Sequence, residues 1–174
     1  DQFAMHNGRV VAFVDPHYET GALAALREVG ANRSSLPLLR GWGVKVDLTN
    51  VVLDAQLAFD LQEENGAMVK HFGILGLTAN QLDRQDVVTA NLDSLNGASF
   101  GALESVRGGA LKMQPLMRST LNAGLTNADN YAQTANPAAL HRGFGGNTKT
   151  YTLAARYQGK AKSFYQRPQN PQRA

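Results

Sequence analysis

The stretch Arg9-Val10-Val11-Ala12-Phe13-Val14, followed by Asp15-Pro16, is a nearly continuous apolar run. Such a run is typical of a strand buried on both faces of a parallel sheet, and the proline ends it because it has no N–H for the ladder. Residues Phe3–Gly8 precede it with the pattern of a helix that stops at a glycine. Because a parallel strand needs neighbours, we expect at least one further strand to come from upstream or from a partner, and the chain to share its function with a larger molecule.

A second short apolar run ends in the same way. Asn50-Val51-Val52-Leu53 leads into Asp54, and the following segment, Ala55–Glu64, places its apolar residues on one helical stripe. Asn65-Gly66 is a strong turn signal, which we expect to form a hairpin leading into Met68–Phe72. Together these patterns predict an α/β domain with a mostly parallel sheet flanked by helices.

Weaker signals extend this prediction along the chain. Helices are expected at residues 20–30, 34–43 and, from a capping box, 78–81, and strands at residues 44–47, 111–116 and 151–157. Pro115 suits an edge strand or a bulge. Residues 122–150 are rich in Asn, Thr, Ala and Gly and predict a long surface loop with a short helix around Ala135–His141. We therefore predict one α/β domain over residues 1–162, with some antiparallel strands toward the C-terminus, and a flexible linker or tail over residues 163–174.

Composition narrows the classes of function. The chain has 174 residues and no cysteine, which excludes disulfides, thiolate metal sites and cysteine nucleophiles. No apolar run reaches the roughly 20 residues of a membrane helix, and no Gly-x-Ser-x-Gly elbow supplies a serine nucleophile. Residues 1–104 carry 7 Lys and Arg against 13 Asp and Glu (−6), whereas residues 105–174 carry 10 against 1 (+9). A basic segment can follow phosphates, but this one has no nucleic-acid motif, so we expect it to be solvated or packed against the acidic part.

Asp15 and Asp54 each end a predicted parallel strand, which is where open α/β sheets bind ligands. Asp15, His17 and Glu19 also resemble a small metal or acid–base cluster, because alternate residues of an extended chain point to the same side. The competing interpretation is structural, since Asp-Pro is a common strand ending. We take Asp15, His17 and Asp54 as candidate ligand-binding residues.

The glycine-rich stretch Gly143–Asn147 offers a second place for a ligand. With Arg142 and Lys149 beside it, this stretch could cradle an anion, and Arg142 and Gly145 complete the candidate ligand-binding set. It lacks the Lys-Ser/Thr ending of a P-loop, so a flexible loop is the simpler interpretation.

The remaining chemistry-bearing residues favour structural roles. The four histidines, at positions 6, 17, 71 and 141, have no metal-ligand spacing. Trp42, the single tryptophan, is expected to fill the core rather than to anchor a partner. We predict no metal site and no catalytic residue.

Several segments, taken in order, resemble a known family. They are Asp1–Pro16, Leu38–Val44, Asn50–Asp54, Leu75–Thr78, Asn91–Asn96 and Tyr151–Arg156. Over roughly residues 1–165 this series resembles the GldG-like gliding-motility family, the auxiliary extracytoplasmic component of uncharacterised ABC-type transport systems. None of these segments is a catalytic signature, so the specificity lies in the series.

The resemblance implies an amidotransferase-like or flavodoxin-like α/β fold, held at the periplasmic face of the bacterial inner membrane by flanking membrane helices that lie outside this chain. It also implies permease and ATPase partners and no catalysis, and the cysteine nucleophile of amidotransferase-like enzymes is absent here. We therefore expect a non-enzymatic binding or interaction subunit with no cofactor and no nucleic-acid partner; a homo-oligomer is compatible with this expectation. The alternatives are a metal-assisted hydrolase using Asp15, His17 and Glu19, and binding of a phosphate-rich ligand by the basic C-terminal third.

Overall fold

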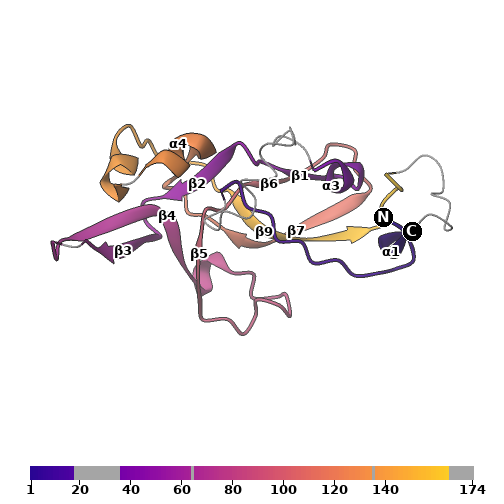
Figure 1. The fold of residues 1–174 in the computed structure, drawn as a ribbon. Helices are drawn as coiled ribbons and strands as arrows, with labels where there is room; N and C mark the ends of the chain where they lie inside the picture. The colour runs from indigo at the N-terminus through magenta and orange to yellow at the C-terminus, as the bar shows by residue number, and fades with distance from the viewer. Residues whose placement is uncertain (18–35, 64, 135, 165–174) are drawn as a thin grey trace.

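The computed structural model describes residues 1–17, 36–63, 65–134 and 136–164. Its helical elements are short: α1 (Gln2–Met5), α3 (Pro37–Gly41), η2 (Ala79–Gln81), α4 (Ala128–Gln133) and η3 (Pro137–His141). The strands are β1 (Val44–Val46), β2 (Asn50–Asp54), β3 (Ala58–Gln62), β4 (Met68–Thr78), β5 (Ser94–Ala98), β6 (Leu103–Ser105), β7 (Leu111–Arg118), β8 (Ala123–Asn127) and β9 (Thr152–Gly159). In Figure 1, α4 and the β3–β4 hairpin occupy one end of the molecule, and α1 and α3 occupy the other. Within the described ranges, no helix has the length and apolar character needed to span a bilayer.

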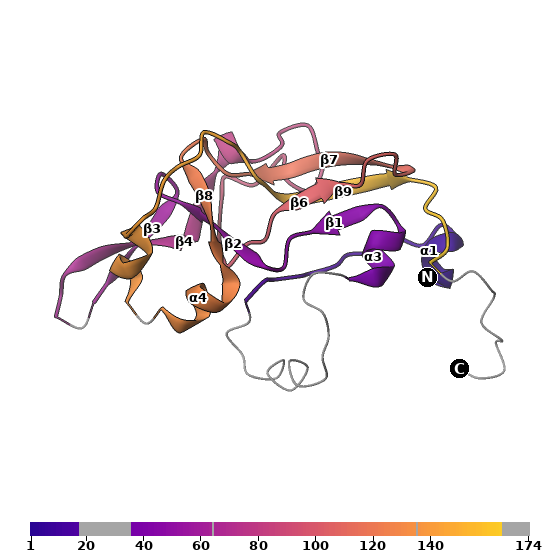
Figure 2. The ribbon, with the colours of Figure 1, turned by 90° about the horizontal axis from the view of Figure 1, so that it is seen from above.

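The strands form three antiparallel sheets, in the orders β1-β6-β9-β7, β3-β4-β5 and β2-β8. The four strands of the largest sheet run side by side in Figure 2. The predicted mostly parallel, flavodoxin-like α/β fold is therefore wrong. A parallel pair needs a long crossover, usually through a helix of a dozen or more residues, whereas α4, the longest described helix, has 6 residues. Turns such as the one at Asn65-Gly66 return the chain antiparallel instead.

The first predicted strand, Arg9–Val14, is also absent from these sheets. Residues 9–15 are extended but belong to no strand in the described part of the chain. Val11 and Phe13 on one face are 80% and 89% exposed and Val10 on the other is 52% exposed, so neither face is buried as in a core strand. Its apolar character indicated burial, but burial requires neighbouring strands that the described residues do not supply.

The segment Ala55–Glu64 was predicted to be helical and instead contains strand β3. Leu57, Phe59 and Leu61 alternate with small or polar residues, which is the period of a strand. The turn that follows was predicted correctly: Gly66 has a φ of +84°, and the Asn65 side chain accepts a hydrogen bond from the Ala67 N–H at 2.8 Å. The hairpin thus constrains both of its arms to be strands.

Strand β2 was predicted as a buried strand, and it is the centre of the molecule. Val52 faces one hydrophobic core, together with Leu75, Leu77 and Leu153, and both of its neighbours face a second. Those neighbours, Val51 and Leu53, pack with α4 and η3. The apolar run 51–53 therefore reflects burial on both faces, as predicted, but in an antiparallel pair with β8.

Several other local predictions are confirmed. Strands β1 and β9, helix α3, and the capping box at Thr78 lie where the patterns placed them. Pro115 lies in β7, an edge strand whose register shifts between Pro115 and Met117. Trp42 is 8% exposed and its Nε1–H donates to Asp1 at 2.9 Å, so it fills the core as expected.

The predicted loop over residues 122–150 is wrong in its first half. That half forms β8 and then α4, which begins where the Asn127 side chain accepts hydrogen bonds from the N–H groups of Asp129 and Asn130. The short helix expected near residue 137 is confirmed as η3. The predicted helix 20–30 and most of the predicted tail lie outside the described residues.

Candidate functional site

Two histidines and a tyrosine meet where α4 packs against β4. The ring of Tyr131, which is 7% exposed, lies edge-on to His17, with 5.5 Å between the ring centroids, and to His71, at 6.0 Å. The Ser99 hydroxyl lies 3.4 Å from the Tyr131 hydroxyl. We call these four residues, His17, His71, Ser99 and Tyr131, the histidine–tyrosine cluster.

A glycine makes room for this tyrosine. A Cβ atom at Gly73 would lie 2.6 Å from the Tyr131 hydroxyl oxygen and would overlap its ring. The Gly73 N–H is directed toward His71 Nδ1 at 3.3 Å, and its carbonyl accepts from the Ser99 N–H at 3.0 Å. Ser99 takes a positive φ of 57°, which is uncommon for a residue with a side chain. The backbone at Gly73 and Ser99 therefore helps to determine where the side chains of the histidine–tyrosine cluster lie.

A second aromatic group lies next to the first, because Phe72, which follows His71 in β4, packs against the same hydrophobic core as Tyr131. Phe72 stacks on His141 with 4.1 Å between centroids and 20° between the ring planes, and it meets Phe144 edge-on at 4.9 Å. His141 Nε2 lies 2.6 Å from the Lys70 carbonyl oxygen, which can only accept, so this nitrogen carries the proton and donates. We call Phe72, His141 and Phe144 the aromatic stack.

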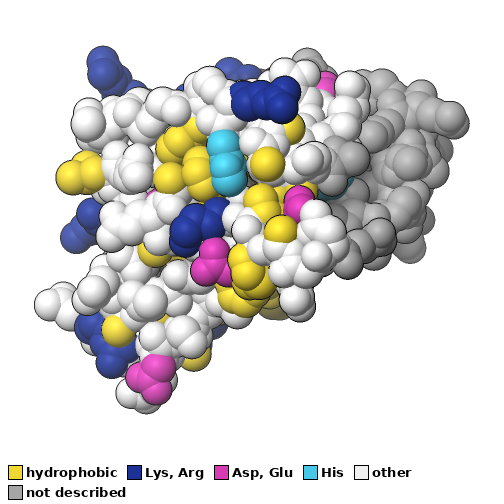
Figure 3. Space-filling model, turned by 90° about the vertical axis from the view of Figure 1, so that its left-hand side faces the viewer, with side chains coloured by type: hydrophobic (Ala, Val, Ile, Leu, Met, Phe, Trp, Pro, Cys, Tyr) yellow, Lys and Arg dark blue, Asp and Glu magenta, His cyan; other side chains and the backbone are white. Residues whose placement is uncertain are grey.

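The aromatic stack continues into an apolar surface. Met68 begins β4, four residues before Phe72, and is 64% exposed. Around it, Lys70 and Asp60 form an exposed ion pair at 3.5 Å. Figure 3 views the molecule from this end and shows hydrophobic side chains gathered around a histidine, with charged side chains beside them. We call the aromatic stack, Met68 and this ion pair the hairpin surface.

The predicted Asp15, His17 and Glu19 cluster is only partly described. The Asp15 side chain lies at the surface, and partial burial raises the pKa of its carboxyl group above the usual value. His17 lies against Tyr131, and its Nδ1 is buried without a hydrogen-bond partner among the described residues. Glu19 lies outside the described residues. Of this trio, the structure therefore places His17 in the histidine–tyrosine cluster.

Asp54 is fully buried and holds the backbone together. Its carboxylate accepts hydrogen bonds from the N–H groups of Gln56, at 2.9 Å, and Leu57, at 3.1 Å. It also accepts from the N–H of Thr120 at 2.7 Å and from the Thr120 hydroxyl at 2.9 Å. These four bonds leave little capacity for a ligand, so the carboxylate acts as a clamp between the end of β2 and the loop before β8.

Arg142 and Gly145 lie in the loop after η3. Arg142 is exposed, and a Cβ atom at Gly145 would meet nothing within 4 Å. The loop docks on β8, since the Asn147 N–H donates to the Ala123 carbonyl at 3.0 Å. Ala123 pairs with Asp54, so the loop lies one strand away from that carboxylate. Lys149, the other expected anion ligand, lies 5.2 Å above the Tyr151 ring as a cation–π contact.

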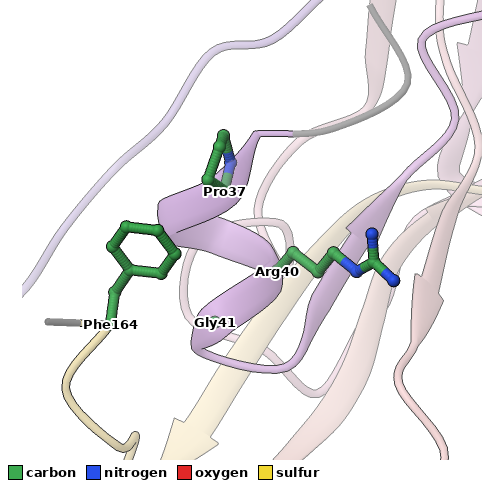
Figure 4. Close-up of a pocket in the computed structure, with 4 residues that line it drawn as sticks. All are labelled: Pro37, Arg40, Gly41 and Phe164. Atoms are coloured by element: carbon green, nitrogen blue, oxygen red, sulfur yellow. The ribbon is translucent and has the colours of Figure 1, made fainter. Parts of the chain in front are cut away.

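The structure also has a shallow, open pocket of about 410 Å³ near α3, lined by Pro37, Arg40, Gly41 and Phe164. Figure 4 shows that the Arg40 guanidinium points away from the Phe164 ring. This leaves the hollow with an aromatic ring and backbone but no set of converging polar groups. Helix α3 lies at the opposite end of the molecule from α4, which carries Tyr131, so this pocket is separate from the histidine–tyrosine cluster.

The chemistry of this arrangement comes mainly from its aromatic rings. Among the described residues, no three His, Asp or Glu side chains converge to hold a metal ion. The Ser99–Tyr131 contact is too long for a strong hydrogen bond, which a nucleophile and its base would need. What the cluster and the stack provide is a set of rigid aromatic rings at one end of the molecule.

Sequence reasoning missed the residues at the centre of this site, Phe72, Ser99 and Tyr131. The capping signal at Asn127 could have placed Tyr131 on a helix. Nothing local indicates that Tyr131 meets His17 or His71, because these residues lie 114 and 60 positions away along the chain.

Comparison with known protein families gives a match over the whole chain. A sequence model of the family described as ABC-type uncharacterized transport system matches residues 1–174. No curated protein and no solved structure matches the chain significantly.

Proposed function

Because the chain belongs to the family of auxiliary components of uncharacterised ABC-type transport systems, we propose that it is a non-catalytic interaction subunit that binds a protein partner through the hairpin surface. The observation that supports this most directly is the combination of a packed aromatic stack with an exposed methionine. Aromatic residues and methionine are enriched in the centres of protein interfaces, where rigid rings contribute binding energy at small entropic cost. The neighbouring Lys70–Asp60 pair provides the polar rim that such interfaces have.

The partner that we propose is the permease of the same transport system, contacted on the periplasmic side of the bacterial inner membrane. In this proposal the ATPase belongs to the same assembly and is reached through the permease. We further propose that the chain is of the GldG-like type. The support for these finer statements is the ordered series of segments that resembles that family.

A co-purification experiment tests the role of the hairpin surface. The chain is expressed with its cognate permease and ATPase, extracted from native membranes in mild detergent, and captured by a tag on the permease. Met68→Asp places a charge at the apolar centre of the hairpin surface and is expected to reduce recovery of the chain by about 10-fold or more. The matched control is Val87→Asp, which adds the same charge at a side chain that is 86% exposed elsewhere.

Equal recovery of the Met68 and Val87 variants would contradict the docking role. Cell location is tested separately: protease added to intact spheroplasts should degrade the chain if it faces the periplasm. Protection from the protease until the inner membrane is lysed would place it on the other side.

A further inference from the structure

Residues 9–15 are an extended stretch with apolar side chains directed into solvent. Val10, Val11 and Phe13 are 52%, 80% and 89% exposed. Figure 1 shows this stretch as a long indigo trace after α1 that carries no strand arrow. Exposed apolar runs of this kind mark sites of protein association.

The stretch has the composition of a strand. Val10, Val11 and Val14 are β-branched and Phe13 is aromatic, which are the residue types that favour sheets. The two faces of the extended chain are both apolar, since Val10, Ala12 and Val14 alternate with Val11 and Phe13. An unpaired backbone with these side chains can add to another strand.

The ends of the stretch are held by the rest of the molecule. At one end the Gly8 N–H donates to the Phe3 carbonyl at 2.9 Å, which closes the turn after α1. At the other end Pro16 is buried against Gly101: a Cβ atom there would lie 3.0 Å from the proline ring. Fixed ends reduce the entropy that the stretch loses when it pairs.

The charges at its two ends are opposite. Arg9 opens the stretch and Asp15 closes it, and neither forms an ion pair with another described residue. An antiparallel alignment of two copies centred on Ala12 places Arg9 opposite Asp15, twice. The same register places Val11 opposite Phe13 and Val10 opposite Val14. Aromatic with β-branched residues, and opposite charges, are the pairs that stabilise antiparallel strands.

From this self-complementarity we propose that residues 9–15 of two copies of the chain pair as antiparallel strands and form a symmetric dimer. A parallel alignment would place Arg9 opposite Arg9 and Asp15 opposite Asp15, and like charges in register are destabilising. The antiparallel arrangement has a two-fold axis at Ala12, so the two copies meet through the same residues, as in a symmetric dimer. This inference is independent of the hairpin surface, because that surface contains none of residues 9–15.

The absence of native cysteine makes a direct test simple. Ala12→Cys places one thiol on the proposed axis, where the two Cα atoms of a paired position lie about 4.5–5.5 Å apart, within reach of a disulfide. Mild oxidation of the purified chain should convert this variant to a covalent dimer. Ala110→Cys, at another exposed alanine, is the matched control and should stay largely monomeric.

Charge reversal tests the register. Arg9→Asp or Asp15→Arg alone places like charges opposite each other twice, so each should weaken self-association by about 10-fold in sedimentation velocity. The double variant restores both pairs and should associate like the parent chain. Circular dichroism controls for folding, and all these side chains lie at the surface, so the fold should be kept.

Three results would overturn the proposal. They are a chain that stays monomeric at every concentration, cross-linking of the Ala12 variant no faster than that of the Ala110 control, and a double charge variant that behaves like the single ones. A monomer that pairs through residues 9–15 with a different protein would belong to the first of these.

Discussion

Asp54 shows how a residue expected to bind a ligand can instead hold the fold together. It ends a strand, as the sequence indicated, but its carboxylate is fully buried and accepts four hydrogen bonds from the protein itself. Hydrogen bonds to an ionised group are the stronger class, and each buried donor left without a partner is costly.

We therefore expect Asp54→Ala to lower the free energy of unfolding by about 3 kcal/mol, because it leaves the N–H of Thr120 without its acceptor. Thr120→Val is the matched partial change, since it keeps the Thr120 N–H and removes only the hydroxyl, which donates to Asp54 and accepts from the Asn122 N–H at 3.0 Å; it should cost about 1 kcal/mol. Urea denaturation followed by circular dichroism measures both. Two variants with equal, small effects would show that Asp54 is not a clamp.

Tyr157 gives a prediction for alkaline conditions. Burial, with a smaller contribution from the charge of Glu104, raises the pKa of its phenol from 10.0 to about 12. The hydroxyl lies 3.1 Å from the Glu104 backbone carbonyl, to which it can donate, and 3.1 Å from the Met113 sulfur. The folded state thus favours the protonated phenol more than the unfolded state does.

The consequence for stability follows from that sign. The contribution of Tyr157 is fully present below the unfolded pKa of 10.0 and is lost as the pH rises toward the folded value of about 12. Absorbance near 295 nm should show one tyrosine that titrates late, and Tyr157→Phe should remove that step and flatten the alkaline loss of stability. A late step that persists in the phenylalanine variant would assign it to another tyrosine.

At the scale of elements, the signals of turns, caps and bulges were reliable, whereas the type of some segments and the direction of strand pairing were not. The Asn65-Gly66 turn, the Thr78 capping box and the Pro115 bulge are determined by a few adjacent residues, and each was predicted correctly. The direction of strand pairing depends on residues far apart: β2 pairs with β8, whose residues lie about 70 positions further along. No pattern within either strand specifies that partner.

In the same way, only part of the candidate site was predictable from the sequence, and the contacts between its residues were not. His17 was singled out for its spacing to Asp15, yet its contact is with Tyr131, on a helix expected to be loop. The fit of Tyr131 depends on Gly73, whose missing side chain leaves space for the ring. A glycine within an apolar strand signals close approach of another group, but the identity of that group becomes visible only when α4 is placed against β4.

The apolar runs Arg9–Val14 and Asn50–Asp54 show most clearly that a sequence pattern alone does not determine whether a segment is buried. Both have the composition of a doubly buried strand, and only the second is buried. In β2, α4 and η3 cover one face and the strands around Leu75 cover the other. Residues 9–15 have no such cover among the described elements, so identical patterns lead to opposite environments.

At the scale of the whole molecule, the acidic and basic parts of the chain share two of the sheets. Asp86 belongs to the acidic part and accepts two hydrogen bonds of 2.7 Å from Arg156 in the basic part, whose guanidinium lowers the pKa of that carboxyl group. Strand β2 of the acidic part pairs with β8 of the basic part. In the sheet order β1-β6-β9-β7, β6 at the end of the acidic part lies beside β9 of the basic part. The basic third is therefore integrated into the fold, as one of the two structural interpretations expected.

This pairing of strands from both parts predicts that the chain folds as one cooperative unit. We expect fragments 1–108 and 109–174, divided at the exposed Gly108 turn between β6 and β7, to be unfolded when separate, because each lacks partners for its strands. The first fragment loses β8, the partner of β2, and the second loses β6, one partner of β9. Mixing them should restore the β-sheet signal in circular dichroism and the emission of the buried Trp42. A cooperative urea transition in fragment 1–108 alone would show instead that its sheets are self-sufficient, and that strands β7 to β9 are added to an already folded core.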